Sequence, residues 1–595
     1  MTNAVKNASA AAVVVMFGLM ATRASANSGV QLPLSQYQAG TEQTNSSLIV
    51  NPNFESVDAN NFPIGWTAAT PDAGTIMTAG SPNPANLPSP ATVLGTRVQR
   101  VFDAGGIDAF DNYKITQNIT LAPNTDYVLS SYLWNYGQVG PAPHTDLVNG
   151  DLVGVELEPT VPGDETAGYF VEPIGVDGVT SANGGFFVYK SFNSSQFLNS
   201  NGVVRLELEF DPNQNIQPFT LRPPLSAQWD NIALTPLAQF SSQVFTNPAG
   251  GSYDTVANWI NGPVNARTAI ATFRGSTSQA TVSLSANRRM AVINFDGAGG
   301  YVLNGAGSIV LDHEEKRDAV IINSLQGNNS IQNTIVVNAG TDAFSTSLTP
   351  RNFKVNVANS NGVLTVGDVV AGSVGTFGTG TFSVIKTGPG RFDPAGIRAR
   401  SLQIDQGTVR MVPGSQTSRV QTLVIAGDST PTARLDLTNR ALVVDYSDAS
   451  PLPTILAQLT AGAGGGNGIG SGFSVSYGVG YAEASQLSMV PAGFGSVDST
   501  AVLLRGTLLG DANLDGTVNL DDFTALAASF GGPGGWINGD FNYASGVNLD
   551  DFTALAANFG QSVAGDAPRG AVPEPTSAVL LVAAAALMHR RRHMA

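Results

Sequence analysis

An acidic loop near the carboxyl end of this 595-residue chain has the ligand spacing of a calcium site. Calcium prefers about six to eight oxygen ligands around a sharp turn. Oxygen-bearing residues occupy loop positions 1, 3, 5, 7, 9 and 12, and Gly516 at position 6 permits the turn. The candidate ligands are Asp511, Asn513, Asp515, the Thr517 carbonyl, Asn519 and Asp522. The sequence therefore predicts that this first loop, residues 511–522, encloses one calcium ion.

A second loop, residues 540–551, keeps part of the same pattern. Asp540, Asn542, Asn548 and Asp551 hold positions 1, 3, 9 and 12. Position 5 is Ala544, which has no side-chain oxygen, and position 6 is Ser545 in place of glycine. We expect this loop to bind calcium more weakly, because it has lost a carboxylate and its turn is harder to make.

Each loop leads into a segment with helical periodicity. Residues 519–531 return as residues 548–560 with one difference, Ser529 against Asn558. In the first copy Phe523, Leu526, Ala527 and Phe530 recur at helical spacing. This spacing predicts two helices that pack against each other.

The duplicated loop and helix resemble a type I dockerin. The resemblance implies calcium-dependent folding and docking onto a cohesin in assemblies that degrade polysaccharide. Loop positions 10 and 11 are Leu520-Asp521 and Leu549-Asp550, whereas that family often has small hydroxylated residues there. An intramolecular structural role is therefore an equal alternative to cohesin binding.

Residues 46–237 have the alternating pattern of a β-sandwich. Successive side chains of a strand point to opposite faces, so Leu129 and Leu133 are predicted in the core and three aromatics on the other side. These aromatics are Tyr132, Trp134 and Tyr136. A second strand turns Arg205, Glu207 and Glu209 outward. Flat aromatic rings beside charged hydrogen-bonding groups suit sugars, so these six residues form a candidate carbohydrate site. The alternative is that a loop covers the aromatics.

The strands that begin near Leu48, Ile115 and Ala227 resemble those of carbohydrate-binding jelly-roll modules. This resemblance implies a jelly-roll sandwich that binds polysaccharide. Trp66 and Trp229 are predicted to be core residues.

Residues 238–450 form a Gly-rich region of short strands separated by turns. This rhythm fits a β-solenoid or a stacked sandwich. The Lys386–Gly390 turn, followed by the strands of residues 402–410, resembles an autotransporter-associated β-strand repeat, and Gly251–Trp259 resembles its opening motif. Residues 451–509 look like a closing cap with short helices at Leu452–Leu459 and Tyr481–Leu487.

The two ends of the chain have the features of export signals. Residues 1–26 combine Lys6, an apolar run and Ala24-Ser25-Ala26, which predicts a signal peptide; a linker, 27–45, follows. After a second linker, 563–571, residues 572–595 hold Val572–Pro575, an apolar run over Ala578–Met588 and then Arg590–Arg592. This tail resembles a PEP-CTERM sorting signal, which implies recognition by an exosortase. We expect contact with a membrane only through these terminal segments.

Composition excludes several classes of function. The net charge of −16 disfavours nucleic acid as a partner, and the absence of cysteine excludes disulfides and thiolate metal sites. His313-Glu314-Glu315 has no second histidine four residues on, so it is interpreted as a solvated turn rather than a zinc site.

These features together predict a mainly β, exported protein of the cell surface, outer envelope or extracellular space. We expect a non-catalytic role in binding polysaccharide or building surface matrix, with calcium as the only cofactor. The alternatives are an enzyme of polysaccharide breakdown, or a cohesin-docked component of that process.

Overall fold

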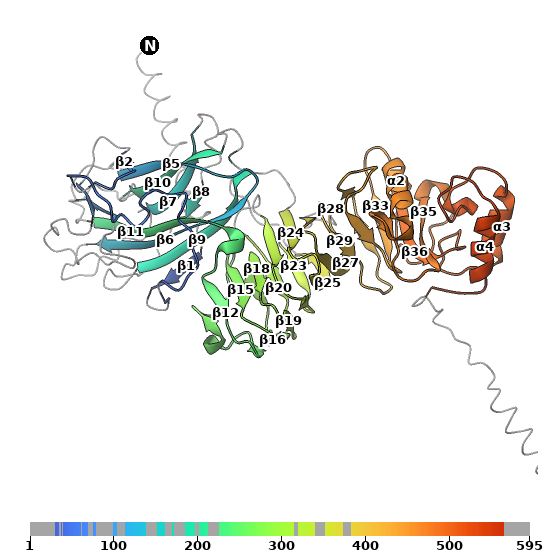
Figure 1. Ribbon diagram of the computed structural model, residues 1–595, viewed down its shortest axis with the longest axis horizontal. Helices are drawn as coiled ribbons and strands as arrows, with labels where there is room; N and C mark the ends of the chain where they lie inside the picture. Colours follow the sequence, from blue (N-terminus) through green and yellow to red (C-terminus); the bar gives the residue numbers. More distant parts are fainter. Residues whose placement is uncertain are drawn as a thin grey trace, which may run out of the picture. The chain divides into compact units, whose positions relative to one another are not determined.

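The structure is a computed structural model with a mainly β fold, as predicted (Figure 1). It describes residues 30–34, 37–38, 40–60, 62–68, 75–78, 99–103, 113–137, 152–160, 169–171, 185–195, 197, 202–211, 225–313, 319–338, 351–372 and 382–563. The predicted signal peptide and sorting tail lie outside these residues. The described residues up to Val409, with Val420–Ala426, form one compact unit; Arg410–Arg419 and the described residues from Gly427 onward form a second.

The first unit begins with a sandwich of two antiparallel sheets. Sheet A has the order β1 (Val30–Pro33), β9 (Gly185–Asn193), β6 (Asp126–Gly137), β11 (Leu225–Pro236), β4 (Gln99–Asp103) and β3 (Thr75–Thr78). Sheet B has the order β2 (Thr67–Ala68), β5 (Tyr113–Thr120), β10 (Val203–Asp211), β7 (Leu152–Pro159) and β8 (Tyr169–Val171). Strand β1 lies within residues 27–45, where the sequence suggested a linker, and it extends sheet A by pairing with β9.

Apolar side chains from both sheets meet in one core between them. Leu129 and Leu133 of β6 face inward as the alternation predicted, opposite Leu206 and Leu208 of β10. Trp66 and Trp229 are also buried in this core, which confirms their predicted role. The inward side of each strand is therefore fixed, and the outer faces of the two sheets point in opposite directions.

A parallel solenoid follows, which decides between the two architectures that the sequence left open. One sheet has the order β14 (Trp259–Ile260), β12 (Gln243–Phe245), β15 (Ile270–Arg274), β18 (Val292–Asp296), β21 (Val320–Ser324), β24 (Arg351–Val357), β26 (Phe382–Thr387), β28 (Ser401–Ile404) and β31 (Thr422–Ile425). The other contains β13 (Gly250–Ser252), β16 (Ala280–Ser283), β19 (Tyr301–Asn304), β22 (Asn329–Ile331), β25 (Val363–Ala371), β27 (Arg391–Ile397) and β29 (Thr408–Arg410). Three further strands, β17 (Arg288–Met290), β20 (Ile309–Leu311) and β23 (Ile335–Val337), pair beside it. Neighbouring coils pair in parallel from β12 to β15 onward.

Glycine closes a solenoid turn where no side chain would fit. Gly300 has a φ of +77°, and a Cβ atom there would lie 2.0 Å from the Asn328 carbonyl oxygen of the next coil. Inside the coils, aromatic rings contact one another from strand to strand at a tilt, with Phe273 5.6 Å from Phe245 and 5.4 Å from Phe295 between ring centroids. The abundance of glycine and the short strands thus reflect coils stacked at a fixed spacing.

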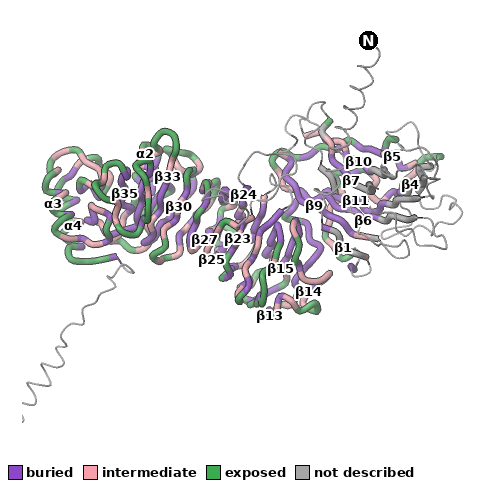
Figure 2. The backbone as a smooth tube through the Cα atoms, turned by 180° about the vertical axis from the view of Figure 1, so that it is seen from behind, coloured by how far each residue is buried: buried purple, intermediate pink, exposed green. Residues whose placement is uncertain are grey.

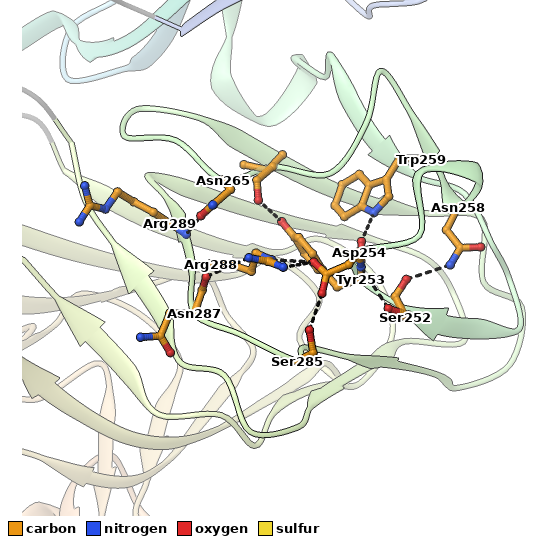
Figure 3. Close-up of polar contacts among 11 residues, drawn as sticks. Ser252, Tyr253, Asp254, Asn258, Trp259, Asn265, Ser285, Asn287, Arg288 and Arg289 are labelled. Carbon is orange, nitrogen blue, oxygen red and sulfur yellow. Dashed lines mark hydrogen bonds and ion pairs between the residues drawn. The ribbon is translucent and has the colours of Figure 1, made fainter.

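The motif at Gly251–Trp259 organises the first coil (Figure 3). Trp259 donates its indole N–H to the Tyr253 carbonyl at 2.7 Å, and the Tyr253 hydroxyl donates to the Val264 carbonyl at 2.9 Å. Asp254 accepts from Ser285 at 2.7 Å and from Arg288 at 2.8 Å. These two hydrogen bonds outweigh burial and lower the pKa of Asp254. The motif is therefore a structural closure of the coil.

The second unit combines a small sheet with the helix pair. Strands β30 (Ser418–Val420), β33 (Ala441–Asp445), β36 (Ala501–Leu508) and β35 (Tyr477–Glu483) form this sheet, while β32 (Arg434–Asp436) pairs in parallel with β34 (Gly468–Gly470). The helices are α2 (Leu452–Gly462), α3 (Leu520–Ser529) and α4 (Leu549–Asn558). Short 3-10 turns lie at Leu237–Gln239, Val256–Asn258, Ala463–Gly465, Ala484–Gln486 and Trp536–Asn538.

Helix α2 confirms the prediction at Leu452–Leu459, but the helix predicted at Tyr481–Leu487 is wrong. Residues up to Glu483 belong to β35, and only a 3-10 turn, Ala484–Gln486, follows. Cross-strand pairing with β36 decides the conformation here. Among the described residues, no helix combines the length and apolar character needed to span a bilayer.

Candidate calcium loops and sandwich faces

The first loop brings its two end positions together. Asp511 is buried, and its carboxylate oxygens accept from the backbone N–H groups of Asp515 at 3.1 Å and Gly516 at 3.0 Å. Asp522, in the first turn of α3, accepts from the N–H groups of Ala512 at 2.8 Å and Asn519 at 2.8 Å. The loop backbone therefore wraps around carboxylates at positions 1 and 12, as the sequence predicted.

The ligands between these ends lie nearer the surface. Asp515 is exposed and accepts from the Asn513 side-chain amide at 3.1 Å, while the Asn513 amide oxygen accepts from the Asp515 N–H at 2.9 Å. Thr517 donates its N–H to Asp515 at 2.8 Å. Asn519 is the N-cap of α3, because its side chain accepts from the Asp521 N–H at 2.7 Å.

Burial in this loop disfavours the charged forms of Asp511 and Asp522. Burial, with the neighbouring charge of Asp522, raises the pKa of Asp511 to about 7, and burial also raises the pKa of Asp522. Arg505 acts in the opposite direction on Asp511 and donates to the Leu514 carbonyl at 2.8 Å. The candidate ligand atoms of the loop are all oxygens, and together they carry excess negative charge. Calcium prefers ligands of this kind.

The three carboxylates of this loop do not all lie within ligand distance of one another. Among the described residues, the only acidic trio with ligand atoms all within 4.8 Å of one another is Glu156, Glu158 and Glu207 in sheet B.

The second loop has the same backbone conformation as the first. Leu514 and Tyr543 at position 4 have φ values of +61° and +60°. Gly516 and Ser545 at position 6 have φ values of +90° and +64°. Ser545 thus makes the turn despite its side chain, and its N–H donates to Asp540 at 2.8 Å.

The remaining residues of the second loop also match those of the first. Asp551 accepts from the Asn548 N–H at 3.0 Å, and Asn542 accepts from the Ala544 N–H at 2.9 Å. Burial raises the pKa of Asp540. The two loops therefore differ mainly in the carboxylate that Ala544 cannot supply.

The helix pair, residues 510–562, is packed firmly within the second unit. Trp536 is fully buried, and its indole N–H donates to the Asp511 carbonyl at 2.7 Å. Gly478 and Gly480 of β35 leave space for this ring, because a Cβ atom at Gly480 would lie 2.7 Å from its Nε1 atom. Tyr543 also donates to the Val479 carbonyl at 2.9 Å. The first loop is thus joined directly to the side of a β-sheet.

The predicted aromatic site on sheet A is wrong for Tyr132. This side chain has an exposed fraction of 0%. Its hydroxyl hydrogen-bonds to Glu42 and accepts from the Gly40 N–H at 2.9 Å, and Tyr37 covers the same face by stacking on Phe187 at 4.9 Å. The N-terminal segment therefore covers Tyr132, which was the alternative for this position. The side chains of Trp134 and Tyr136 lie outside the described residues.

The charged part of the predicted site lies on a different face. Arg205 and Glu207 project from the outer side of sheet B, whereas Tyr132 projects from the outer side of sheet A. The expectation that all six residues share one groove is therefore wrong, because β6 and β10 belong to opposite sheets. The Glu209 side chain lies outside the described residues.

The outer face of sheet B holds a network of charged groups. Arg205 pairs with both Glu207 and Glu158, and Lys114 donates to Glu207 at 3.0 Å. Strand register aligns Arg205 with Glu158 and Glu207 with Glu156. Ion pairs with Glu207 and Glu158 raise the pKa of Arg205 against the opposing effect of burial. Sequence reasoning missed Lys114, Glu156 and Glu158, although alternation along their strands would have turned them outward.

His313 is a further correction, because it is buried rather than part of a solvated turn. Its Nε2 atom lies 3.2 Å from the Ser191 hydroxyl, and its carbonyl accepts from Arg351 at 2.8 Å. Burial, with Arg351 and Lys190 nearby, holds the pKa of His313 well below its usual value. Glu314 and Glu315 lie outside the described residues.

Comparisons with known proteins give limited further information. No family model and no curated protein matches the chain. The chain is similar to TmCBM61, solved in complex with β-1,4-galactotriose, at 12% identity over 32% of this chain and 97% of that one, with a TM-score of 0.20. It is also similar to CBM27-1 of Caldicellulosiruptor saccharolyticus, solved in complex with mannohexaose, at 8% identity over 28% and 88%, with a TM-score of 0.16. Both are carbohydrate-binding modules, but TM-scores this low carry no functional argument.

Proposed function

We propose that this is an exported, non-catalytic protein that binds polysaccharide at the outer face of sheet B. The network of Lys114, Arg205, Glu158 and Glu207 supports this proposal most directly. Arg205 and Glu158 are partly exposed on this face, with 41% and 28% of their side chains accessible, whereas Glu207 is buried and pairs with both Arg205 and Lys114. Sugar hydroxyls both donate and accept hydrogen bonds, so the accessible Arg205 and Glu158 can bind them, while Glu207 holds Arg205 in place.

The same proposal includes calcium in the second unit and a location at the cell surface or outside the cell. Asp511, Asn513, Asp515, Thr517, Asn519 and Asp522 would hold the ion in the first loop. Its charge would neutralise carboxylates that burial otherwise disfavours. Because the helix pair packs against a sheet of its own unit, we assign the ion a structural role there. The terminal segments support export and recognition by an exosortase.

A glycan-binding assay tests the first part. We expect the purified chain to bind a subset of polysaccharides by affinity electrophoresis, and Arg205→Ala to weaken that binding about tenfold or more. Arg398→Ala removes an exposed arginine of the solenoid and should leave binding unchanged. Equal binding by both variants would contradict the site, and release of reducing ends by the wild-type chain would favour an enzyme instead.

Calorimetry tests the calcium part. We expect the full chain to bind calcium and Asp515→Ala to lose most of the affinity of the first loop. Asp521→Ala removes an exposed carboxylate at position 11, outside the ligand set, and should bind normally. Absence of calcium uptake by the wild-type chain would contradict the proposed calcium site. It would leave the proposal of glycan binding untouched.

A further inference from the structure

The two helices of the helix pair expose matching apolar stripes. On α3, Leu520 and Phe523 are exposed by 66% and 37%, and Phe530, the residue that ends the helix, is exposed by 53%. Leu549 and Phe552 of α4 and its end residue Phe559 have the same three values. The first two residues of each set are three positions apart, so they lie on one side of the helix. The two stripes meet where Phe523 and Phe552 contact each other at 6.4 Å between ring centroids.

These stripes are separate from the part of each helix that packs into the unit. Leu526 and Leu555 are buried in the core of the second unit, and Asp522 and Asp551 are buried at the loops. Figure 2 shows α3 and α4 with many exposed residues. Soluble proteins rarely expose contiguous apolar surface of this kind without a binding role. We call the six exposed side chains the apolar face.

The charge beside the apolar face restricts what can bind it. Asp521 and Asp550 are exposed next to Leu520 and Leu549, and neither helix has a basic residue in its last turn. A second copy of this chain would bring these acidic groups against each other, and the net charge of −16 adds to the repulsion. A basic apolar segment is the better complement.

The chain itself contains such a segment close by. Residues 578–588 are apolar and are followed by Arg590–Arg592. The described chain ends at Val563, whose N–H donates to the Gly516 carbonyl of the first loop at 2.7 Å. The intervening residues 564–577 can span up to about 46 Å. As a helix the apolar segment would be about 16 Å long, close to the roughly 15 Å of α3 or α4.

We propose that the apolar face binds the chain's own segment 578–588, with Arg590–Arg592 paired to Asp521 and Asp550. If segment 578–588 lay against α3 and α4 as a third helix, it would bury apolar side chains that each of the three otherwise exposes to water. Binding within one chain also benefits from the high effective concentration that a short tether provides. The helix pair would then keep the apolar segment covered in water and release it where a bilayer or another receptor competes.

Thiol protection tests this proposal, because the chain has no cysteine of its own. Four single variants, Ala583→Cys, Ala584→Cys, Ala585→Cys and Ala586→Cys, cover one helical turn, and Ala571→Cys in the tether is the control. In the full chain at low concentration, we expect at least one of the four to react with a soluble disulfide reagent about tenfold more slowly than the control. Combining that variant with Phe523→Ser and Phe552→Ser should restore fast reaction, and replacing Arg590–Arg592 with glutamine should restore part of it.

Three outcomes would overturn the proposal. All four cysteines could react as fast as the control, or the protection could survive the two serine substitutions, which would mean that the segment is covered elsewhere. Protection that disappears on dilution would point to a second copy as the occupant. Unchanged circular dichroism and calcium affinity in the serine variants would show that they remain folded. The result does not depend on glycan binding.

Discussion

Trp536 connects the first candidate calcium loop with the sheet of the second unit. It is fully buried and donates to the Asp511 carbonyl, so it contributes both packing and one hydrogen bond. We predict that Trp536→Ala lowers the free energy of unfolding of this unit by about 3–5 kcal/mol, because the large cavity cannot collapse. Urea denaturation followed by circular dichroism measures this loss. Trp536→Phe should cost less, and an equal loss in both would point to the hydrogen bond instead of the cavity.

The buried Lys386 makes the stability of the solenoid depend on pH, and the direction of this dependence follows from its pKa. Its buried ammonium group donates to the carbonyls of Thr387 at 2.7 Å, Gly388 at 2.7 Å and Gln406 at 3.2 Å. Burial lowers the pKa of Lys386 from 10.5 to about 8. Between these values the unfolded chain binds the proton that the folded chain has released, so stability rises with pH in this window.

We predict that the free energy of unfolding of the first unit increases from pH 8 to 10 by up to about 1.4 kcal/mol per unit from this group. Lys386→Met is the control, because it keeps the length of the side chain without the charge. Denaturation curves of both proteins across this pH range should have different slopes. Parallel curves would contradict the prediction.

Tyr132 shows the limit of sequence reasoning for single residues. Alternation assigned the correct face to Tyr132, Leu129 and Leu133, because that depends on neighbours within one strand. It could not show that Tyr37 and Glu42, some 90 residues earlier, cover this face. The backbone turns of the two candidate calcium loops depend mainly on contacts within each loop, so they lie within reach of the sequence pattern.

At the level of elements, a ladder of asparagines joins neighbouring coils. Asn323 of β21 donates to Asn294 of β18 at 2.9 Å and accepts from Asn356 of β24 at 3.3 Å. The parallel register aligns these three residues. Each amide therefore satisfies the polar groups of the next inside a largely buried layer.

We predict that Asn323→Leu lowers the free energy of unfolding of the first unit by about 1–3 kcal/mol, because amide groups of Asn294 and Asn356 each lose a partner. Asn361→Leu alters an exposed asparagine of the same region and should change stability by less than about 0.5 kcal/mol. Equal effects of the two substitutions in urea denaturation would show that the ladder contributes nothing.

Helices and strands were not equally predictable from the sequence. The helix pair was correctly predicted because the periodicity of each helix lies within one short segment, residues 519–531 or 548–560. Residues 481–483 were predicted to begin a helix, but they form part of β35 because they pair with β36. The sequence also left solenoid and sandwich undecided, because the direction of strand pairing is a long-range property.

At the scale of the whole first unit, the sandwich is joined to the solenoid by polar contacts from several coils. Lys354 of β24 pairs with Asp126 of β6 at 2.8 Å, and the Tyr189 hydroxyl of β9 accepts from the Ile270 N–H at 3.2 Å. Ser191 and His313 add a third contact. These contacts make the sandwich and the solenoid parts of one larger folded body.

We predict that Lys354→Ala lowers the stability of the sandwich and the solenoid together, by about 1–2 kcal/mol, because Asp126 loses a charged partner. Hydrogen exchange measured by mass spectrometry should show increased opening in both β6 and β24. An increase confined to one of the two strands would mean that they unfold independently.

The way in which the sandwich is joined to several coils also has a mechanical consequence. If a force were to pull on the sandwich, the tension would pass into the coils from β15 to β24 through several contacts loaded at the same time, and not through one hinge peptide. Parallel ladders resist such shear because many hydrogen bonds must break at once. The sandwich and the solenoid are therefore expected to resist tension as one body.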